Sequence, residues 1–141
     1  MKTIVQPYLF FGGHCEEALE FYRKALGAEV EMTMRFNENP QPAASGTVPP
    51  GFEKKIMHAT FRIGETKVMA SDGNETGLKF EGFSLSLSVP TKAEADQAFS
   101  ALAAGGTVDL PIGKTFWSPW FGMVTDKFGI GWMIGVATTN P

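Results

Sequence analysis

The sequence has little charge and no concentrated positive segment. Of its 141 residues 19% are charged, and 15 acidic against 12 basic side chains give a net charge of −3. Soluble domains carry about 25% charged residues, so this chain is charge-poor. Nucleic-acid binding needs a positive face that neutralises phosphates, and no basic run supplies one. We therefore expect no nucleic-acid partner.

The sequence also lacks cysteine pairs and long apolar runs. Cys15 is the only cysteine, which excludes an internal disulfide and a metal site built on cysteine pairs. One free thiol is compatible with a reducing cytosol. The apolar run 3–11 is interrupted by Gln6 and Pro7, and no stretch reaches the ~18 to 20 apolar residues of a membrane span. We expect a soluble cytoplasmic protein with no membrane partner.

Glycine and proline, by contrast, are abundant. The 16 glycines and 9 prolines favour many tight turns and argue against a helical bundle or a coiled coil. A hydrophobic content of 43% excludes disorder over most of the chain. The length predicts a single domain, 1–141.

Hydrophobic periodicity predicts eight strands and two helices. Strands are expected at 4–11, 30–36, 56–63, 66–71, 83–89, 107–110, 122–125 and 131–136. The first helix is expected from Glu16 to the stop at Gly27, and the second from the capping box Thr91–Glu94 to the stop at Gly105. The irregular segment 37–55 is long enough to be a lid, a partner-contacting arm or a disordered loop, and its role stays open.

The two halves of the chain repeat one another. Three residues of the first half recur 78 positions later, and one glycine recurs 65 positions later because the first half contains the long loop. The pairs are Phe21 with Phe99, Gly27 with Gly105, Val30 with Val108 and Gly64 with Gly129. The order strand–helix–strand–strand–strand also repeats. We predict an α+β fold of two βαβββ modules, about 1–80 and 81–141.

Three motifs accompany this repeat. They are Pro7-Tyr8-Leu9 leading into Glu17-Ala18-Leu19-Glu20-Phe21-Tyr22, then Met69-Ala70-Ser71-Asp72, and Trp117-x-x-Trp120-Phe121-Gly122-x-x-x-Asp126-x-Phe128-Gly129-x-x-Trp132. With two βαβββ modules they resemble, over essentially the whole chain, the PhnB-like branch of the vicinal oxygen chelate superfamily of glyoxalases, bleomycin-resistance proteins and extradiol dioxygenases. Some members of this branch carry a 3-demethylubiquinone methyltransferase label. The resemblance implies a curved mixed sheet around a cavity, usually within a homodimer.

The resemblance also implies where a metal would bind. Metal-using members place ligands on the first and last strands of each module, and here these positions fall at Gln6 and Ser84 and at about Met69 and Met133. Only the Gln6 amide is a credible oxygen ligand, because a serine hydroxyl is weak and thioethers suit soft ions. We predict no classical metal site and no cofactor, and a divalent metal held by Gln6 and other partners stays open.

Two polar residues are candidates for chemistry. His58, on a predicted strand, could act as a general base or as a polar anchor for a ligand, because imidazole titrates near neutral pH. The alternative is a hydrogen-bonded histidine at a sheet or dimer interface. Asp72 could hold a ligand or position His58, but an aspartate before Gly73 is also common in turns.

Aromatic residues supply the remaining candidates. One strand cannot bury three large aromatic rings on one face, and the segment carries Trp117, Trp120 and Phe121. Such rings bind flat or apolar ligands, or else they fill the core or a dimer interface. Tyr8 and Phe10 share a strand face with Gln6 by alternation, so these residues could line the same cavity.

Several other site types are missing from the sequence. It has no phosphate-binding P-loop, no G-x-G-x-x-G pattern and no G-x-S-x-G motif, so the residues give methyl transfer no support. The preferred function is binding of a small organic ligand in an aromatic pocket without a classical metal site. The alternatives are a lyase, isomerase or dioxygenase-type enzyme acting on a small oxygenated substrate through His58 or a divalent metal, and an interaction module in which 37–55 and the tryptophan segment serve dimerisation.

Overall fold

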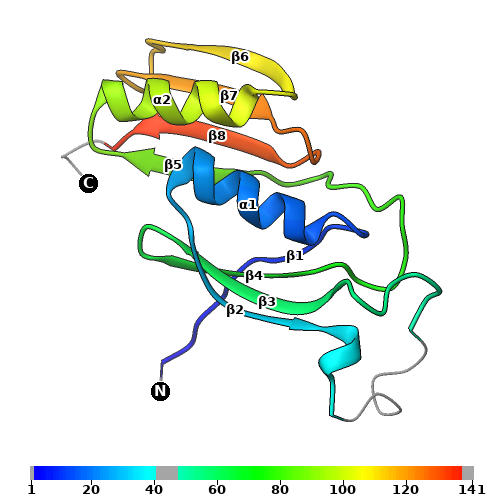
Figure 1. The fold of residues 1–141 in the computed structure, drawn as a ribbon. Coiled ribbons are helices and arrows are strands. Elements are labelled where there is room, and N and C mark those ends of the chain that lie inside the picture. Colours follow the sequence, from blue (N-terminus) through cyan, green and yellow to red (C-terminus); the bar gives the residue numbers. More distant parts are fainter. Residues whose placement is uncertain (1, 41–47, 138–141) are drawn as a thin grey trace. The chain divides into compact units, whose positions relative to one another are not determined.

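The computed structural model describes residues 2–40 and 48–137, and the chain divides into two compact units, Met1–Leu78 and Lys79–Pro141. Each unit contains one α-helix and one four-stranded mixed sheet (Figure 1). The first unit consists of β1 (Tyr8–Phe10), α1 (Cys15–Leu26), β2 (Glu29–Arg35), the 3₁₀ turn η1 (Phe36–Glu38), β3 (Ile56–Ile63) and β4 (Thr66–Ser71). The second consists of β5 (Leu85–Val89), α2 (Lys92–Ala103), β6 (Thr107–Gly113), β7 (Phe121–Thr125) and β8 (Gly131–Val136). The predicted α+β fold of two βαβββ modules is confirmed.

The sheet of the first unit has the strand order β1-β4-β3-β2, in which β1 runs parallel to β4 and the other pairs are antiparallel. The prediction of a strand over 4–11 was wrong at its beginning, because β1 starts only at Tyr8. Pro7 has no amide hydrogen to give to a ladder. Its carbonyl still accepts a hydrogen bond from the Met69 amide at 3.0 Å. The proline therefore accounts for the start of the strand at Tyr8.

Helix α1 covers one face of this sheet (Figure 1). Its stripe of Ala18, Leu19 and Tyr22 is buried, and the Tyr22 ring stacks on Phe61 of β3 with centroids 6.1 Å apart. The helix ends where the sequence predicted, since Gly27 adopts φ 67° and its amide donates to the Arg23 carbonyl. This packing makes the α1-facing side of the sheet the core of the unit.

The second unit repeats this topology with the order β5-β8-β7-β6 and a parallel β5–β8 pair. The Thr91 hydroxyl accepts from the Glu94 amide at 3.2 Å, which is the first half of the predicted capping box. Strand β6 continues past its predicted end at Leu110 to Gly113, although Pro111 lies within it. An edge strand tolerates proline where its ladder is irregular, and the β6–β7 register shifts between Leu110 and Gly113.

The remaining predictions have mixed outcomes. Strands 56–63, 66–71 and 131–136 are confirmed with their predicted bounds, whereas β5 begins at Leu85, two residues later than expected. Residues 41–47 of the predicted loop 37–55 lie outside the described residues, so the role of that segment stays a prediction. The chain divides between Leu78 and Lys79, near the predicted module boundary at residue 80, and the single-domain prediction stays a prediction.

Neither α1 nor α2, the α-helices within the described residues, has the length and apolar character to cross a membrane.

Candidate functional site

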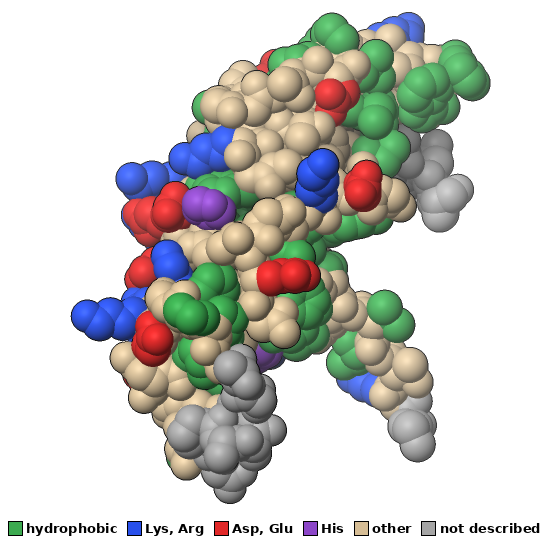
Figure 2. All heavy atoms as spheres, turned by 90° about the vertical axis from the view of Figure 1, so that its right-hand side faces the viewer, with side chains coloured by type: hydrophobic (Ala, Val, Ile, Leu, Met, Phe, Trp, Pro, Cys, Tyr) green, Lys and Arg blue, Asp and Glu red, His purple; other side chains and the backbone are tan. Residues whose placement is uncertain are grey.

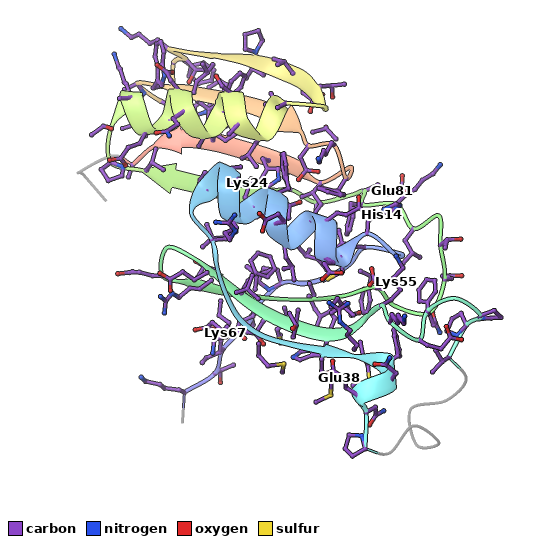
Figure 3. The ribbon with its side chains drawn as sticks, viewed as in Figure 1. His14, Lys24, Glu38, Lys55, Lys67 and Glu81 are labelled. Atoms are coloured by element: carbon purple, nitrogen blue, oxygen red, sulfur yellow. The ribbon has the colours of Figure 1, made fainter. Side chains whose placement is uncertain are left out.

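The face of the first sheet that α1 does not cover carries most of the candidate residues. Strand alternation and register place on it the side chains of Tyr8, Phe10, Met32, Met34, His58, Thr60, Met69 and Ser71, and we call this set the open face. Leu9, Ala59 and Ala70 alternate with them and are buried on the α1 side. Figure 3 shows Lys67, two residues before Met69, on the side of the sheet away from α1. The open face is thus built from all four strands of the unit.

Two aromatic rings on β1 form a stacked pair on this face. The centroids of Tyr8 and Phe10 are 4.9 Å apart with an interplanar angle of 28°. The two residues keep 38% and 47% of their surfaces exposed. Apolar side chains also reach the surface elsewhere (Figure 2), but here two exposed rings stack on one another. An exposed ring pair of this kind offers a platform for a flat ligand.

His58 is joined to this pair by a hydrogen bond. Its Nδ1 lies 3.0 Å from Tyr8 Oη, and the two ring centroids are 5.6 Å apart. Strand β4 lies between β1 and β3, so the tyrosine side chain reaches across β4 to the histidine. The structure therefore brings together Tyr8, Phe10 and His58. The bond fixes the orientation of the imidazole, which can donate or accept according to its tautomer.

Charged side chains near the open face are paired. Arg62 lies 2.6 Å from Glu29 and 3.8 Å from Glu31, and Lys67 lies 3.6 Å from Glu31. These side chains keep between 34% and 69% of their surfaces exposed, so each pair adds only a little stability. Two cations and two carboxylates leave this end of the sheet with balanced charge.

Asp72 has a different place from the other candidates. It is 1% exposed, and its Oδ1 accepts from the amides of Gly13 at 2.9 Å and Cys15 at 2.7 Å, while Oδ2 accepts from the Ile56 amide at 2.8 Å. Amides at the start of a helix have no partner within it, and a carboxylate there also suits the helix dipole. Asp72 thus anchors α1 to β3 from within the core. Sequence reasoning considered a turn here and missed this anchoring, because an aspartate before glycine carries no signal of a distant helix.

The thiol of Cys15 is buried close to the carboxylate of Asp72. Desolvation by burial, and then the charge of Asp72, raise the pKa of the Cys15 thiol well above its usual range. The thiol is fully buried and is held in its protonated form. It is therefore not a nucleophile in the folded protein.

The aromatic segment of the second unit divides between two sides of its sheet. Trp117 lies against Phe121 with centroids 5.7 Å apart, and it is 55% exposed. Trp120 instead donates through Nε1 to Asp96 of α2 at 2.7 Å, and Lys92 of α2 lies 4.9 Å from its ring. Alternation along β7 places Phe121 on the side away from α2. The structure brings together Trp117 and Phe121 and separates Trp120 from them.

The positions that would hold a metal in the superfamily carry few suitable donors. Gln6 lies before β1 and is half-buried, Met69 is on the open face, Ser84 precedes β5, and Met133 is on β8. In residues 2–40 and 48–137, no three histidine, cysteine, aspartate or glutamate side chains gather in a group that could hold a metal ion. One amide, one hydroxyl and two thioethers are a poor donor set for a hard or borderline divalent ion. These residues do not fit the metal centre of the superfamily.

A repeated βαβββ unit whose helix covers one sheet face is the fold of the glyoxalase/bleomycin resistance protein/dioxygenase superfamily. A solved member of that superfamily from Sphaerobacter thermophilus DSM 20745 matches this chain with a TM-score of 0.62 and 20% identity. The match covers 97% of this chain and 99% of that structure, and at this identity it shows the fold alone.

The family follows from closer matches. The model of the 3-demethylubiquinone-9 3-methyltransferase family matches residues 3–135, so this chain belongs to that PhnB-like family. Protein YjdN of Escherichia coli K12 is 37% identical over 97% of each chain. The crystal structure of PA1353 from Pseudomonas aeruginosa shares 40% identity with a TM-score of 0.83, covering 96% of this chain and 98% of that one. A structure from Bacillus cereus described as a putative 3-demethylubiquinone-9 3-methyltransferase, PhnB protein, shares 30% identity with a TM-score of 0.80, covering 96% and 100%. The predicted PhnB-like resemblance is confirmed.

Proposed function

We propose that this protein binds a small organic ligand with a flat, apolar part on the open face, without a classical metal centre. The observation that carries the proposal is the exposed Tyr8–Phe10 stack with His58 hydrogen-bonded at its edge. The rings supply apolar contact, and the phenol–imidazole pair supplies polar orientation. A few polar groups among apolar ones is the usual composition of the lining of a small-molecule site.

The methionines beside the rings support the same proposal. Met32, Met34 and Met69 lie on the open face in register with Thr60, His58 and Tyr8 respectively. Unbranched thioether side chains adapt to irregular shapes and make favourable contacts with aromatic rings. Burying each 40 Å² of their apolar surface under a ligand would contribute roughly 1 kcal/mol. The face therefore favours an apolar body over a strongly hydrated one.

In the second unit, Trp117 and Phe121 are candidates for contact with the same class of ligand. Trp117 is 55% exposed and makes an edge-on contact with Phe121. Trp120 is assigned no ligand contact, because its indole N–H is used by Asp96. Replacing Trp117 by alanine measures whether this pair takes part in binding.

The proposal does not extend to methyl transfer, although the family description names it. A dinucleotide-type cofactor fold binds at the carboxyl ends of a parallel sheet behind a glycine-rich turn. Each sheet here has one parallel pair and is otherwise antiparallel, and the sequence has no G-x-G-x-x-G pattern. Ligand binding is the function that these residues support.

The test is a ligand-observed NMR screen of neutral aromatic fragments, followed by dissociation constants for the hits. Phe10→Ala is expected to weaken a hit about tenfold, the loss of one ring contact. Phe83→Ala is the matched control, because Phe10 and Phe83 are both 47% exposed and Phe83 lies in the second unit. A set of hits whose affinities are unchanged by Phe10→Ala and by His58→Ala would overturn the proposal.

A second candidate is an enzyme that moves a proton on a small oxygenated substrate. The Tyr8–His58 hydrogen bond favours it, because an oriented imidazole is a suitable general base. Such an enzyme would catalyse the exchange of an acidic C–H hydrogen of a bound ligand for deuterium from D₂O. NMR spectroscopy measures the rate of this exchange. Exchange that requires His58, and is lost in His58→Ala while binding persists, would favour this enzyme over simple binding.

We also propose that the chain is a cytoplasmic homodimer. Phe116 supports this, since it is 96% exposed and a partner would cover it. Sedimentation velocity over a concentration series tests it. A monomer at all concentrations would contradict the proposal.

A further inference from the structure

The hydrogen bond between Tyr8 and His58 restricts the polar groups that the open face can bind. A neutral phenol and a neutral imidazole carry two exchangeable protons between them, and the 3.0 Å bond uses one. If Tyr8 Oη donates, His58 Nε2 keeps its proton. If His58 Nδ1 donates, the phenol keeps its own. In both arrangements one N–H or O–H donor remains for a third group.

We propose that this third group is a carboxylate on the flat part of the ligand, so that the open face is selective for aromatic carboxylates. The inference rests on the proposed function and names its ligand class. The ring of such a ligand would lie against Tyr8 and Phe10, and its carboxylate would accept the remaining donor of the Tyr8–His58 pair.

Protonation of His58 decides between a carboxylate and a neutral acceptor. An imidazolium donates through Nδ1 to Tyr8 Oη and leaves two donors, the Nε2–H and the phenol O–H. The positive charge favours an anionic carboxylate over a neutral acceptor, because charge-assisted hydrogen bonds are roughly twice as strong as neutral ones. A bound carboxylate therefore favours the protonated histidine, so binding to protein with a neutral imidazole takes up a proton.

The charged groups around His58 do not offer a competing site for a cation. Among the described residues, the residue opposite His58 on β2 is Met34, and Glu29 and Glu31 of that strand are paired with Arg62 and Lys67. Asp72, just past the end of β4, is buried and holds three amides. These three carboxylates, in the described part of the chain, already have partners and do not offer an amine ligand a free charge.

The test uses three probes with the same ring and different charge: 1-naphthoate, 1-naphthamide and 1-naphthylmethylamine. Binding is measured by calorimetry at about pH 6 and about pH 8, which bracket the ordinary range of histidine. The wild type is expected to bind naphthoate about tenfold more tightly than naphthamide at the lower pH, a difference of about 1.4 kcal/mol. The preference is expected to shrink at the higher pH, because a neutral imidazole offers a carboxylate no positive charge and one donor fewer.

Three variants assign the effect to the pair. Tyr8→Phe keeps the ring and removes the phenol proton, so the preference for naphthoate should fall several-fold. His58→Gln should bind naphthoate with no pH dependence. His14→Gln is the matched control, because His14 is exposed at the start of α1 and away from the open face (Figure 3). Calorimetry of the wild type in two buffers of different ionisation enthalpy measures proton uptake without any substitution.

The outcomes separate this inference from the proposed function. If naphthamide or the amine binds as tightly as naphthoate, and Phe10→Ala weakens that binding, ligand binding stands and carboxylate selectivity is wrong. A naphthoate preference that survives both Tyr8→Phe and His58→Gln, or binding without proton uptake, also overturns the inference. If none of the three probes binds, or if Phe10→Ala changes nothing, both proposals fall.

Discussion

The carboxylate of Asp72 accepts a hydrogen bond from the backbone amide of Cys15 at 2.7 Å, across 57 positions of sequence. The same side chain bonds the amides of Gly13 and Ile56, so one buried residue joins the start of α1 to the start of β3. The helix has no capping bond from its own N-cap side chain, His14. Asp72 supplies the acceptor that the helix start lacks.

Replacing Asp72 by alanine is therefore expected to lower the free energy of unfolding on the order of 3 kcal/mol, because three amides lose a charged partner in the core. The free energy of unfolding of Asp72→Asn should lie between those of the wild type and Asp72→Ala. The asparagine oxygen can still accept from two of the amides, but its NH₂ group faces the Ile56 N–H. Urea denaturation measures both. Glu65→Gln, which removes an exposed carboxylate from the β3–β4 turn, is the control. A loss below about 1 kcal/mol for Asp72→Ala would contradict this anchoring.

The thiol of Cys15 is expected to resist modification in the folded protein. Burial, aided by the charge of Asp72, raises its pKa, and the thiolate is the reactive species. Dithionitrobenzoate should react at least about 100-fold more slowly with native protein than with protein unfolded in urea. The chain has one cysteine, so the signal reports one site. Asp72→Ala should accelerate the reaction by loosening the start of α1. Complete labelling of the native protein within mixing time would show that Cys15 is accessible.

The ion pair between Glu16 and Arg35 should make a small, pH-dependent contribution to stability. The hydrogen bond from Arg35, 2.6 Å from Glu16, lowers the pKa of that carboxyl. A lowered pKa in the folded state stabilises the protein above the unfolded pKa, and this stabilisation is lost as the pH falls through the folded value. Glu16 is 67% exposed, so Glu16→Gln should cost less than about 1 kcal/mol at neutral pH.

Urea titrations of wild type and Glu16→Gln from neutral to acid pH measure this contribution. The difference in unfolding free energy should disappear in acid. Glu17→Gln is the matched control, because Glu17 is a second carboxylate in the first turn of α1 and lies 3.6 Å from the imidazole of His14 instead of beside an arginine. A difference that grows toward acid pH would contradict the assigned sign.

The fold could be predicted from the sequence because its determinants are local. Alternation in β3 and β4 separates the buried Phe61 and Ala70 from the open face, and helical spacing places Tyr22 in the core. Repetition of the same pattern in the second half then predicts the topology twice. The errors occur where one residue changes the hydrogen bonding, as at Pro7, whose missing amide hydrogen shortens β1.

The candidate site could be predicted only in part. Period-two alternation is sufficient to place Tyr8 and Phe10 on one face. It does not indicate that Tyr8 meets His58, 50 positions away, because that contact requires β4 to lie between β1 and β3. Trp120 and Asp96 are 24 positions apart and meet through the packing of α2, which no local pattern reports.

Chelation of metal ions is expected to leave this protein unchanged. Gln6, Ser84, Met69 and Met133, at the positions of the superfamily ligands, are a poor donor set for hard divalent ions. Dialysis against EDTA should shift the unfolding temperature by less than about 1 °C, since no bound ion is lost from the folded state. Elemental analysis of protein purified without chelator gives the second measurement. Stoichiometric zinc, nickel, iron or manganese, lost together with stability, would show that other residues form a metal site.

The packing of the second unit depends on a glycine in β7. A methyl group at Gly122 would lie 2.7 Å from Phe99 Cε2 of α2 and 2.8 Å from Ile112 Cα of β6. Gly122→Ala should therefore lower the free energy of unfolding by about 2 kcal/mol, the cost of overpacking a core. Gly113→Ala is the matched control, since its added carbon meets nothing within 4 Å, and it should stay within about 0.5 kcal/mol. Phe99→Leu in the Gly122→Ala background should recover part of the lost stability. The smaller side chain relieves the contact with the Phe99 ring, whereas the contact with the β6 backbone remains. Equal effects of the two glycine substitutions would show that α2 does not pack closely against β7.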